Sequence, residues 1–424
     1  MRIQLLSAPA HYYTGQPPYR LNPQLGLPIL AAVLEWAGHT AQVYDLEALA
    51  FTPQRLAAQY DAQRGNWPDA VGFTCNSYNR RGVKDCIAAL RGVGYSDYIT
   101  VGGPWATLRA RGSIDEAESW GADSWVAGEC EGNVVRLFEE RLTGIVQGQP
   151  APIASIPSPL WAKHHPSPMT YGGNLPLGNS APPQSISMWS RGCPHSCTFC
   201  GNVVFGGQKI RRRPVAAVYE DMAALKAMGA KSVFVYDDEL LGMPGRAHNG
   251  WLTRCCEAIA PLGLAWQCQG RCSAEWIQPD VLAAMAKAGC KAIMWGVESF
   301  SQRVLDAMHK GTTEADIWHT LRAAKSAGIG NWLFLMVGNY GETAADLAYT
   351  HARLREAMRE GLVQWRQVTV CTPMPGTPLY ETAAREGWLV EAPETGSQMH
   401  QVYQPTPWLS ARDIRYWGAQ LEAA

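Results

Sequence analysis

The chain has 424 residues, which is enough for two or three domains with sizeable apolar cores. Its formal net charge of -1 and the absence of a long basic run give no electrostatic case for a nucleic-acid partner. No secretory signal opens the sequence and no apolar run could span a bilayer, so the 12 cysteines predict a reducing, cytoplasmic compartment and no membrane partner.

Residues 1–146 alternate short apolar runs with segments of helical periodicity, which predicts a doubly wound parallel sheet in an α/β domain. Ligands of such sheets bind beyond the carboxyl ends of the strands, so the loops 74–79 and 102–106 form the candidate site, although each could be an ordinary strand-end turn. The expected strands are residues 2–6, 41–44, 70–73, 98–101 and 124–126, and the expected helices are 25–37, 53–63 and 83–93.

Residues 147–183 carry many prolines and few periodic segments, which predicts an extended linker between two domains. Strands and helices alternate again over residues 184–384. Six β/α units predict a partial (β/α)6 barrel, whose chemistry belongs at the carboxyl ends of its strands. A short tail, 385–424, has a helical end at 411–422 and is expected to cap the barrel. The expected barrel strands are 185–189, 232–236, 264–269, 292–297, 331–337 and 365–371, and the helices are 214–228, 250–260, 279–288, 313–327 and 343–360.

Three cysteines with the spacing C-x3-C-x2-C follow the first strand of this second domain: Cys193, Cys197 and Cys200. Thiolates on one short loop can bind three irons of a cubane cluster and leave the fourth iron open for a small ligand. Zinc is the alternative, but zinc usually takes four ligands from two pairs of the C-x2-C kind, and the second pair is missing. The spacing therefore favours an iron–sulfur cluster.

The segment Arg191-Gly-Cys-Pro-His-Ser-Cys-Thr-Phe-Cys-Gly-Asn202 resembles the cluster loop of the radical S-adenosylmethionine (SAM) family. The resemblance implies a partial barrel and a 4Fe–4S cluster, whose open iron holds the amino and carboxylate groups of SAM. It also implies that an electron from the cluster breaks a C–S bond of SAM to give a 5′-deoxyadenosyl radical. Phe199 matches the aromatic residue that often stands between the last two cysteines of the family.

The same resemblance implies SAM contacts at the strand ends of the barrel. In Tyr236-Asp-Asp-Glu-Leu240, which stands where the family has its amino-binding motif, Glu239 is the first candidate and Asp238 the second; a solvated acidic turn is the alternative. Gly296-Val-Glu-Ser299 resembles the family's G-x-E-S, which assigns Glu298 and Ser299 to SAM or to the barrel mouth.

Three further positions complete the expected barrel site. Arg271 is a natural partner for the SAM carboxylate, or else part of an interdomain salt bridge. Gly338 lies in a motif that resembles one in which glycine lets the backbone approach adenine. Lys310, in Met308-His-Lys-Gly-Thr312, could reach the ribose or carboxylate of SAM, but a lysine beside a helix is more often exposed to solvent, and exposure is the expectation here.

In the first domain, residues 23–27, Gly102-Gly-Pro-Trp-Ala-Thr107 and Gly128-Glu-Cys-Glu131 together look like the cobalamin-binding domain that precedes many radical SAM domains. Trp105 replaces a common histidine, and the D-x-H-x2-G motif is absent, so no histidine is marked out to ligate cobalt from below. The cobalamin contacts implied by this resemblance are Cys75, Asn76, Ser77, Gly102, Gly103, Pro104, Trp105 and Glu129.

Both resemblances together imply a cobalamin-dependent radical SAM enzyme that methylates an unactivated carbon of a small-molecule or peptide substrate. Such an enzyme needs an external electron donor such as flavodoxin or ferredoxin, and we expect a monomer. The alternatives are a rearrangement, cyclisation or oxidation with the same cofactors, and a non-catalytic cobalamin sensor. The three-cysteine loop argues against a sensor, because a sensor has no need for an open iron.

Overall fold

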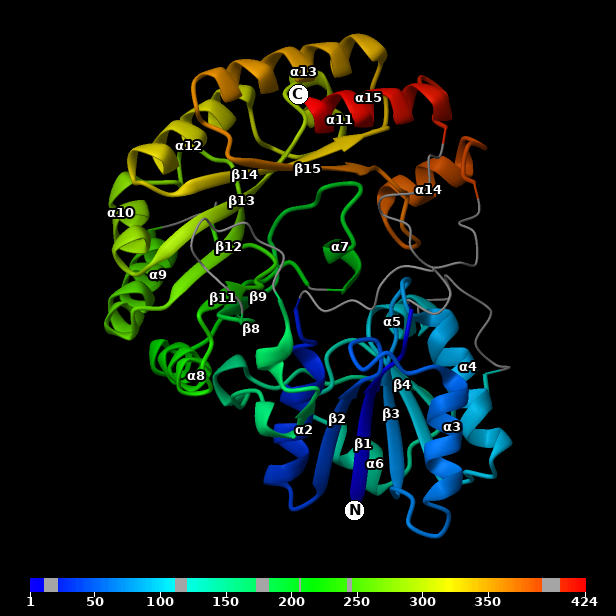
Figure 1. Cartoon of the computed structure of the whole chain (residues 1–424). Coiled ribbons are helices and arrows are strands. Elements are labelled where there is room, and N and C mark those ends of the chain that lie inside the picture. Colours follow the sequence, from blue (N-terminus) through cyan, green and yellow to red (C-terminus); the bar gives the residue numbers. More distant parts are fainter. Residues whose placement is uncertain (11–21, 111–119, 173–182, 206, 242–245, 391–404) are drawn as a thin grey trace. The chain divides into compact units, whose positions relative to one another are not determined.

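The computed structural model describes residues 1–10, 22–110, 120–172, 183–205, 207–241, 246–390 and 405–424. These residues form two compact units (Figure 1). Unit 1 contains the described residues up to 172 together with 183–185, and unit 2 contains the described residues from 186 onward. The chain passes from one unit to the other within strand β8 (Gln184–Ser187).

Unit 1 is built on a seven-stranded sheet in the order β6-β5-β4-β3-β1-β2-β7, and its strand pairs are parallel. The order reverses at β1, which is the mark of a doubly wound sheet and confirms the predicted fold of this part of the chain. The strands are β1 (Arg2–Ser7), β2 (Thr40–Asp45), β3 (Ala70–Thr74), β4 (Tyr98–Gly102), β5 (Ser124–Ala127), β6 (Gly144–Gln147) and β7 (His164–His165).

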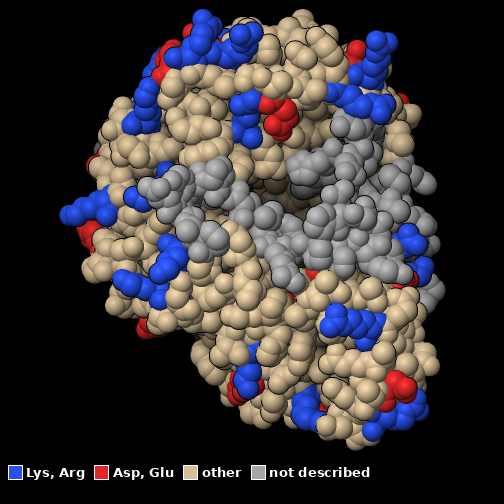
Figure 2. All heavy atoms as spheres, viewed as in Figure 1, with Lys and Arg blue, Asp and Glu red and all other residues tan. Residues whose placement is uncertain are grey.

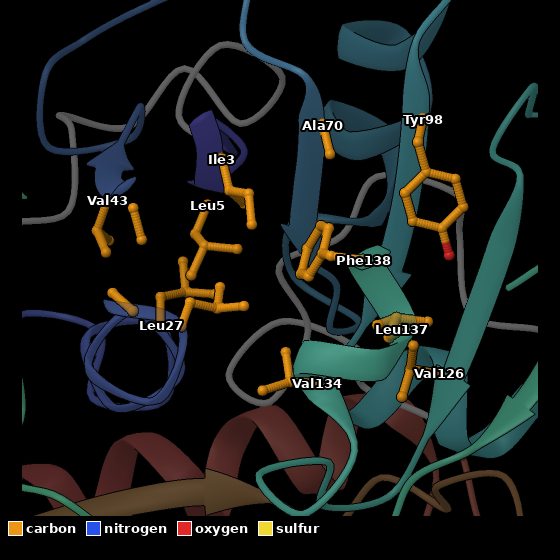
Figure 3. Close-up of a cluster of buried hydrophobic side chains, with 13 residues drawn as sticks. Ile3, Leu5, Leu27, Val43, Ala70, Tyr98, Val126, Val134, Leu137 and Phe138 are labelled. Carbon is orange, nitrogen blue, oxygen red and sulfur yellow. The ribbon is translucent and has the colours of Figure 1, made fainter. Parts of the chain in front are cut away.

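Helices cover both faces of this sheet (Figure 1). Helices α2 and α6 contact each other on one face, and α3 and α4 contact each other on the opposite face. Buried apolar side chains of α2 and α6 pack against β1 and its neighbours and form the core drawn in Figure 3. The helices are α2 (Gly26–Trp36), α3 (Pro53–Ala62), α4 (Arg80–Gly92), α5 (Pro104–Ala110) and α6 (Val134–Glu139).

The described part of the predicted linker adds to unit 1. Strand β7 pairs with β2, and His165 stacks on Tyr44 with ring centroids 5.0 Å apart. Further along, the Tyr171 hydroxyl donates to a carboxylate oxygen of Asp45 at 2.6 Å. Residues 173–182 lie outside the described residues, and the domain boundaries stay a prediction. Three short 3-10 helices also belong to this stretch: Ile153–Ser155, Trp161–Lys163 and Pro168–Thr170.

Unit 2 has a six-stranded sheet in the sequential order β15-β14-β13-β12-β11-β8, with parallel pairing from β11 through β15. Helices line the outside of the curved sheet, which confirms the predicted partial barrel (Figure 1). Besides β8, the strands are β11 (Ser232–Val235), β12 (Ala265–Arg271), β13 (Cys290–Glu298), β14 (Gly330–Val337) and β15 (Trp365–Val370). The outer helices are α8 (Val215–Ala227), α9 (Arg246–Ile259), α10 (Pro279–Lys287), α12 (Glu314–Ser326), α13 (Ala344–Arg359) and α15 (Ala411–Ala423).

Several short elements fill the loops of unit 2. Strands β9 (Ser190–Arg191) and β10 (Arg211–Arg212) pair antiparallel on either side of the cysteine loop and the helix that follows it. The remaining elements are α7 (Asn202–Phe205), the 3-10 helix Ala260–Leu262, α11 (Gln302–Ala307) and α14 (Pro378–Arg385).

Helix α15 completes the helical layer of unit 2 at the last strand, because it packs against β14, β15 and α13. A capping box starts this helix, in which Ser410 and Asp413 satisfy each other's backbone N–H groups. At its other end, Glu422 accepts the N–H of Val368 on β15 at 2.7 Å. The helix therefore satisfies backbone groups that an edge strand would otherwise expose.

A buried ion pair fixes the chain just before the cysteine loop. The guanidinium of Arg213 binds the carboxylate of Asp221, and each side chain is only 3% exposed. Arg213 also donates to two carbonyls at the end of the first barrel strand, with its side chain to Met188 (3.2 Å) and with its backbone N–H to Trp189 (2.9 Å). The pair thus positions the segment from which the cysteine loop emerges.

Removing one member of this pair should therefore destabilise the fold. We expect Asp221→Ala to lower the free energy of unfolding by about 3–5 kcal/mol, because the Arg213 charge would stay buried without a partner. Urea unfolding of the full chain, followed by circular dichroism, measures the effect. The matched control is Asp61→Ala, whose ion pair with Arg64 is more than half exposed and should contribute less than about 1 kcal/mol. Equal effects of the two substitutions would contradict this assignment.

Candidate functional sites of the two units

The three cysteines lie on the loop between β9 and α7, where the N–H of Cys200 donates to the carbonyl of Cys197 at 3.1 Å. Burial, and secondarily Glu239, raise the pKa of Cys193 to about 12. Burial likewise raises the pKa of Cys200. Cys193 is close enough to Cys197 and Cys200 for their charges to act on it. A cation bound at these sulfurs would favour their thiolate forms.

The three cysteines do not form a site for a single metal ion. Among the described residues, no three His, Cys, Asp or Glu side chains gather in a way that could hold one metal ion. A cubane cluster needs one thiolate on each of three irons, so its ligands surround the cluster and do not converge on one point. A tetrahedral zinc site requires convergence. Cys193, Cys197 and Cys200 therefore suit a cubane cluster.

Two carboxylates at the end of β11 anchor the cysteine loop. Asp237 accepts the N–H of Trp189 at 2.8 Å and the hydroxyl of Ser190 at 2.6 Å. Asp238 accepts the N–H of Gly192 at 2.8 Å. Burial raises the pKa of Asp237 to about 7 in spite of these hydrogen bonds. The sequence alone did not single out Asp237, which it shows only as the first of three consecutive acidic residues.

The third carboxylate of the run faces the next strand. Glu239 is buried, and its Oε1 accepts the N–H of Leu241 at 3.0 Å and that of Arg271 at 3.1 Å. Burial raises the pKa of Glu239 to about 8, although Arg271 and Lys310 oppose this shift. Arg271, whose N–H Glu239 accepts, also reaches the sulfur of Cys197 with its guanidinium, so the structure brings Glu239 to the neighbourhood of the cysteine loop.

Glu298 and Lys310 form a buried ion pair at the end of β13. Their charged atoms are 2.9 Å apart, and only 8% of Glu298 and 6% of Lys310 is exposed. The Nζ of Lys310 also lies 5.9 Å from the ring centroid of Phe199. Burial alone would lower the pKa of Lys310, but Glu298 raises it above its usual value. The prediction that Lys310 is exposed was therefore wrong.

Backbone conformation explains why Lys310 turns inward. The two residues beside it, His309 and Gly311, have φ values of +52° and +62°, so the chain bends sharply after α11. Glu298 itself has a φ of +63°, which a non-glycine residue rarely adopts. Such strain persists where the surroundings hold a side chain in a required direction, and it is concentrated at functional sites.

Two other predicted residues have neighbours outside this cluster of charges. The hydroxyl of Ser299 lies 3.0 Å from that of Thr350 in α13 and accepts the N–H of Ser301. Gly338 follows β14 with a φ of +81°, and a side chain there would come within 3.1 Å of Ile414 in α15. Packing against helices is sufficient to explain both residues.

Unit 1 has a half-open cavity of about 180 Å³ at the carboxyl ends of its central strands. It includes the point between β1 and β3 where the strand order reverses, which is the expected ligand site of a doubly wound sheet. Of the predicted residues, Gly102, Gly103 and Glu129 line it. Most of its wall is apolar and includes the core side chains Leu5, Leu27, Leu30, Val126, Val134, Leu137 and Phe138.

The two predicted loops of unit 1 meet through their backbones. The N–H of Cys75 donates to Gly102 at 2.8 Å, and the N–H of Trp105 donates to Cys75 at 3.0 Å. Gly103 has a φ of +97°, and a Cβ there would lie 2.8 Å from the carbonyl oxygen of Cys75. Only glycine fits this position. The close approach of the loops therefore depends on Gly103.

The other predicted residues of these loops do not line the cavity. Cys75 is fully buried, and burial raises its pKa well above the usual value. The side chain of Asn76 accepts the N–H groups of Tyr78 and Asn79 and so closes its own turn. Trp105 is buried beneath the guanidinium of Arg80, which lies 4.8 Å from its ring centroid. Ser77 and Pro104 are exposed beside them.

Sequence reasoning also missed a row of buried hydroxyls at this cavity. The Ser124 hydroxyl donates to that of Thr100 at 2.7 Å and lies 2.6 Å from that of Tyr98. Thr100 lines the cavity and supplies a polar group in a mostly apolar wall. Its signal was a pair of polar residues on the same face of an apolar strand, Tyr98 and Thr100.

None of the described helices is both long and apolar enough to cross a membrane.

Comparison with known proteins identifies both units. The family model of the radical SAM superfamily matches residues 188–354, and that of the B12 binding domain matches residues 19–138. An uncharacterized methyltransferase of Pyrococcus horikoshii is 25% identical, and the match covers 92% of this chain and 84% of that protein. Hopanoid C-3 methylase of Methylococcus capsulatus is 27% identical, with coverage of 87% and 70%.

Solved structures show the same fold. The radical SAM methyltransferase TsrM from Kitasatospora setae gives a TM-score of 0.68 at 17% identity over 92% of this chain and 76% of that one. The cobalamin-dependent SAM radical enzyme OxsB gives 0.70 at 14% identity over 100% of this chain and 66% of that one. At such identities these likenesses establish the fold alone. The two family models show that this chain combines a radical SAM domain with a B12 binding domain.

Proposed function

We propose that this chain is a cobalamin-dependent radical SAM methyltransferase that acts on an unactivated carbon of a small-molecule or peptide substrate. The observation that carries the proposal is that one chain combines a three-cysteine loop at the strand ends of a partial barrel with a cavity at the switch point of a B12-type sheet. Several relatives are named methyltransferases. The TsrM structures hold cobalamin and a 4Fe–4S cluster, or tryptophan substrate and a SAM analogue.

When bound, the 4Fe–4S cluster and SAM supply a 5′-deoxyadenosyl radical, and cobalamin supplies the methyl group. The protein's own part is to bind, orient and exclude water. Cys193, Cys197 and Cys200 hold the cluster. The buried ion pair of Glu298 and Lys310 lies in a low-dielectric environment, where it would act strongly on a charged ligand. A cationic group bound beside Glu239 would favour the carboxylate form that burial disfavours.

The contacts that we propose for SAM follow from these positions. Glu239 is the best-placed partner for the SAM ammonium group, because it is buried in the neighbourhood of the cysteine loop. Asp238 uses one oxygen on Gly192 and stays the second candidate. Glu298, with its partner Lys310, is a further candidate at the end of β13, which is separated from β11 by β12. Ser299 and Gly338 are further candidates by resemblance, and Arg271 is the candidate for the SAM carboxylate.

For cobalamin we propose contacts in unit 1. Cobalamin is larger than the cavity, so only part of the molecule can enter it, lined by Gly102, Gly103 and Glu129. The rest would lie over the joined loops that carry the other predicted residues, which are Cys75, Asn76, Ser77, Pro104 and Trp105. Such close contact with the backbone requires the glycines found there.

The partners and compartment are also proposals. Injection of one electron requires an external donor, for which flavodoxin or ferredoxin is the expected class, and a reducing cytoplasm suits the thiolate ligands. We expect a monomer without a nucleic-acid partner. On the face shown in Figure 2, the described Lys and Arg side chains lie in small separate groups, several of them beside acidic ones.

The cluster assignment has a direct test. Anaerobically reconstituted protein should hold about four irons and four sulfides at the cysteine loop. Changing Cys193, Cys197 and Cys200 together to alanine should abolish the brown chromophore and the bound iron, because the three ligands would be lost. Iron and sulfide analysis with absorption spectra measures this. Alanine at the buried Cys86 of unit 1 is the matched control and should leave the iron content unchanged. A full cluster in the triple variant would contradict the assignment.

The cobalamin site can be blocked without disturbing the sheet. A Cβ added at Gly102 would have its nearest neighbour, the Cβ of Val126, at 3.9 Å, and the φ of Gly102 lies outside the left-handed region. The side chain of Gly102→Phe should therefore be accommodated by projecting into the cavity. We expect at least a tenfold weaker binding of hydroxocobalamin, measured by absorbance titration. Gly92→Phe, at an exposed position of α4 with open space around it, is the control. Unchanged binding in a folded Gly102→Phe protein would place cobalamin elsewhere.

Isotope labelling tests the reaction itself. For each methylated product, methyl transfer should consume two SAM molecules and yield one 5′-deoxyadenosine and one S-adenosylhomocysteine. With SAM that carries a CD3 group, the product should gain the whole labelled methyl, as measured by mass spectrometry. A metabolite extract supplies candidate substrates. If 5′-deoxyadenosine accompanies product while neither label nor S-adenosylhomocysteine appears, a rearrangement, cyclisation or oxidation replaces methyl transfer.

A further inference from the structure

Arg271, at the end of β12, lies against one of the cluster-loop cysteines. Only 4% of the residue is exposed, and its Nη1 lies 3.7 Å from the sulfur of Cys197 as a hydrogen-bond donor. The sulfur of Cys197 is itself buried. A guanidinium in this position adds a charge-assisted hydrogen bond to a thiolate.

Two neighbours hold the guanidinium in this direction. Its Nε donates to the hydroxyl oxygen of Thr312 at 3.1 Å, and the same hydroxyl donates its proton to the carbonyl of Cys272 at 3.1 Å. Because the Thr312 proton is committed to the carbonyl, a lone pair of its oxygen faces Arg271. Thr312 is buried, so water does not compete for these bonds.

The charge of Arg271 has no ion-pair partner among the described residues. Lys310 is paired with Glu298, whereas the nearby Glu239 accepts the backbone N–H of Arg271 and forms no ion pair with its guanidinium within the described part of the chain. A buried cation needs a compensating negative charge. In the proposed enzyme, the thiolates and the iron–sulfur cluster that they bind would supply it.

We infer that Arg271, positioned by Thr312, raises the reduction potential of the cluster through Cys197. The inference rests on the proposed function, because it assumes a cluster at this loop. Reduction adds one negative charge to the cluster, and a fixed cation beside a ligand sulfur stabilises the reduced state more than the oxidised state. Hydrogen bonds to sulfur and solvent exclusion are the means by which proteins set such potentials.

The test is a potentiometric titration of the reconstituted full chain without SAM or substrate, with the reduced cluster followed by electron paramagnetic resonance. At the midpoint potential of the unmodified protein, Arg271→Gln should lower the ratio of reduced to oxidised cluster at least tenfold, a shift of about 59 mV for a one-electron couple. Arg271→Lys keeps the charge and should shift the potential less. Thr312→Val should shift it in the same direction as Arg271→Gln, whereas Thr312→Ser, which keeps the hydroxyl, should not.

Two comparisons make the outcome specific. Arg322→Gln removes an exposed arginine of α12 and should leave the potential unchanged. SAM binding, measured by equilibrium dialysis, is a separate readout: Arg271 is also the candidate for the SAM carboxylate, but a midpoint potential that shifts in the absence of SAM cannot result from lost SAM binding. Loss of SAM binding in Arg271→Gln with an unchanged midpoint potential would overturn the inference.

The remaining outcomes are also decisive. If the Arg271→Gln protein fails to assemble a cluster, the midpoint potentials of Arg271→Lys and Thr312→Val provide the test. Midpoint potentials that are unchanged in both variants would overturn the inference. A shifted potential in a protein that transfers no methyl group would support this role of Arg271 while the proposed reaction fails. An unmodified chain that binds no cluster would contradict both proposals.

Discussion

Compensation of buried charge at the carboxyl edge of the barrel sheet is the constraint on which unit 2 depends. Asp237, Glu239, Arg271, Glu298 and Lys310 are all buried within a few strand ends of one another. Each buried charge is costly unless it is paired or hydrogen-bonded. The chain meets this cost by tying the cysteine loop to Asp237 and by pairing Glu298 with Lys310. The interactions that compensate the buried charges therefore also help to position the cysteine loop.

The candidate site of unit 1 differs from that of unit 2, because the cavity of unit 1 is mainly apolar. There the decisive contacts come from the backbone. Gly103 lets the loop after β4 approach Cys75, and the Thr100 hydroxyl is one polar group in a wall formed by the hydrophobic core. The residues that stabilise the fold, such as Leu137 and Phe138, also shape the cavity (Figure 3). Core packing and ligand space are consequently coupled in this unit.

The sequence was sufficient for the architecture because periodicity and spacing are local properties. Alternation of strands and helices predicted both sheets, and the three cysteines marked the loop without any knowledge of the fold. The sequence could not predict the direction of Lys310, which depends on the left-handed backbone of His309 and Gly311. It also could not separate Asp237 from its acidic neighbours, because the hydrogen-bond partners of Asp237 and Asp238 are 46 to 48 residues away in the chain. Long-range pairing decides such roles, and a local pattern does not contain it.

The contrast between the units also bears on what each can bind. In a low-dielectric region, fixed charges and hydrogen-bond donors act strongly on a charged ligand and select it by the arrangement of its charges. An apolar cavity with glycine-lined backbone selects by shape and contact area, with a few polar groups that fix orientation. A zwitterionic ligand at a metal cluster belongs to the first kind of site, and a bulky ring system to the second. The division of this chain into a charged site and an apolar site thus follows the chemistry of the two ligands that we propose for it.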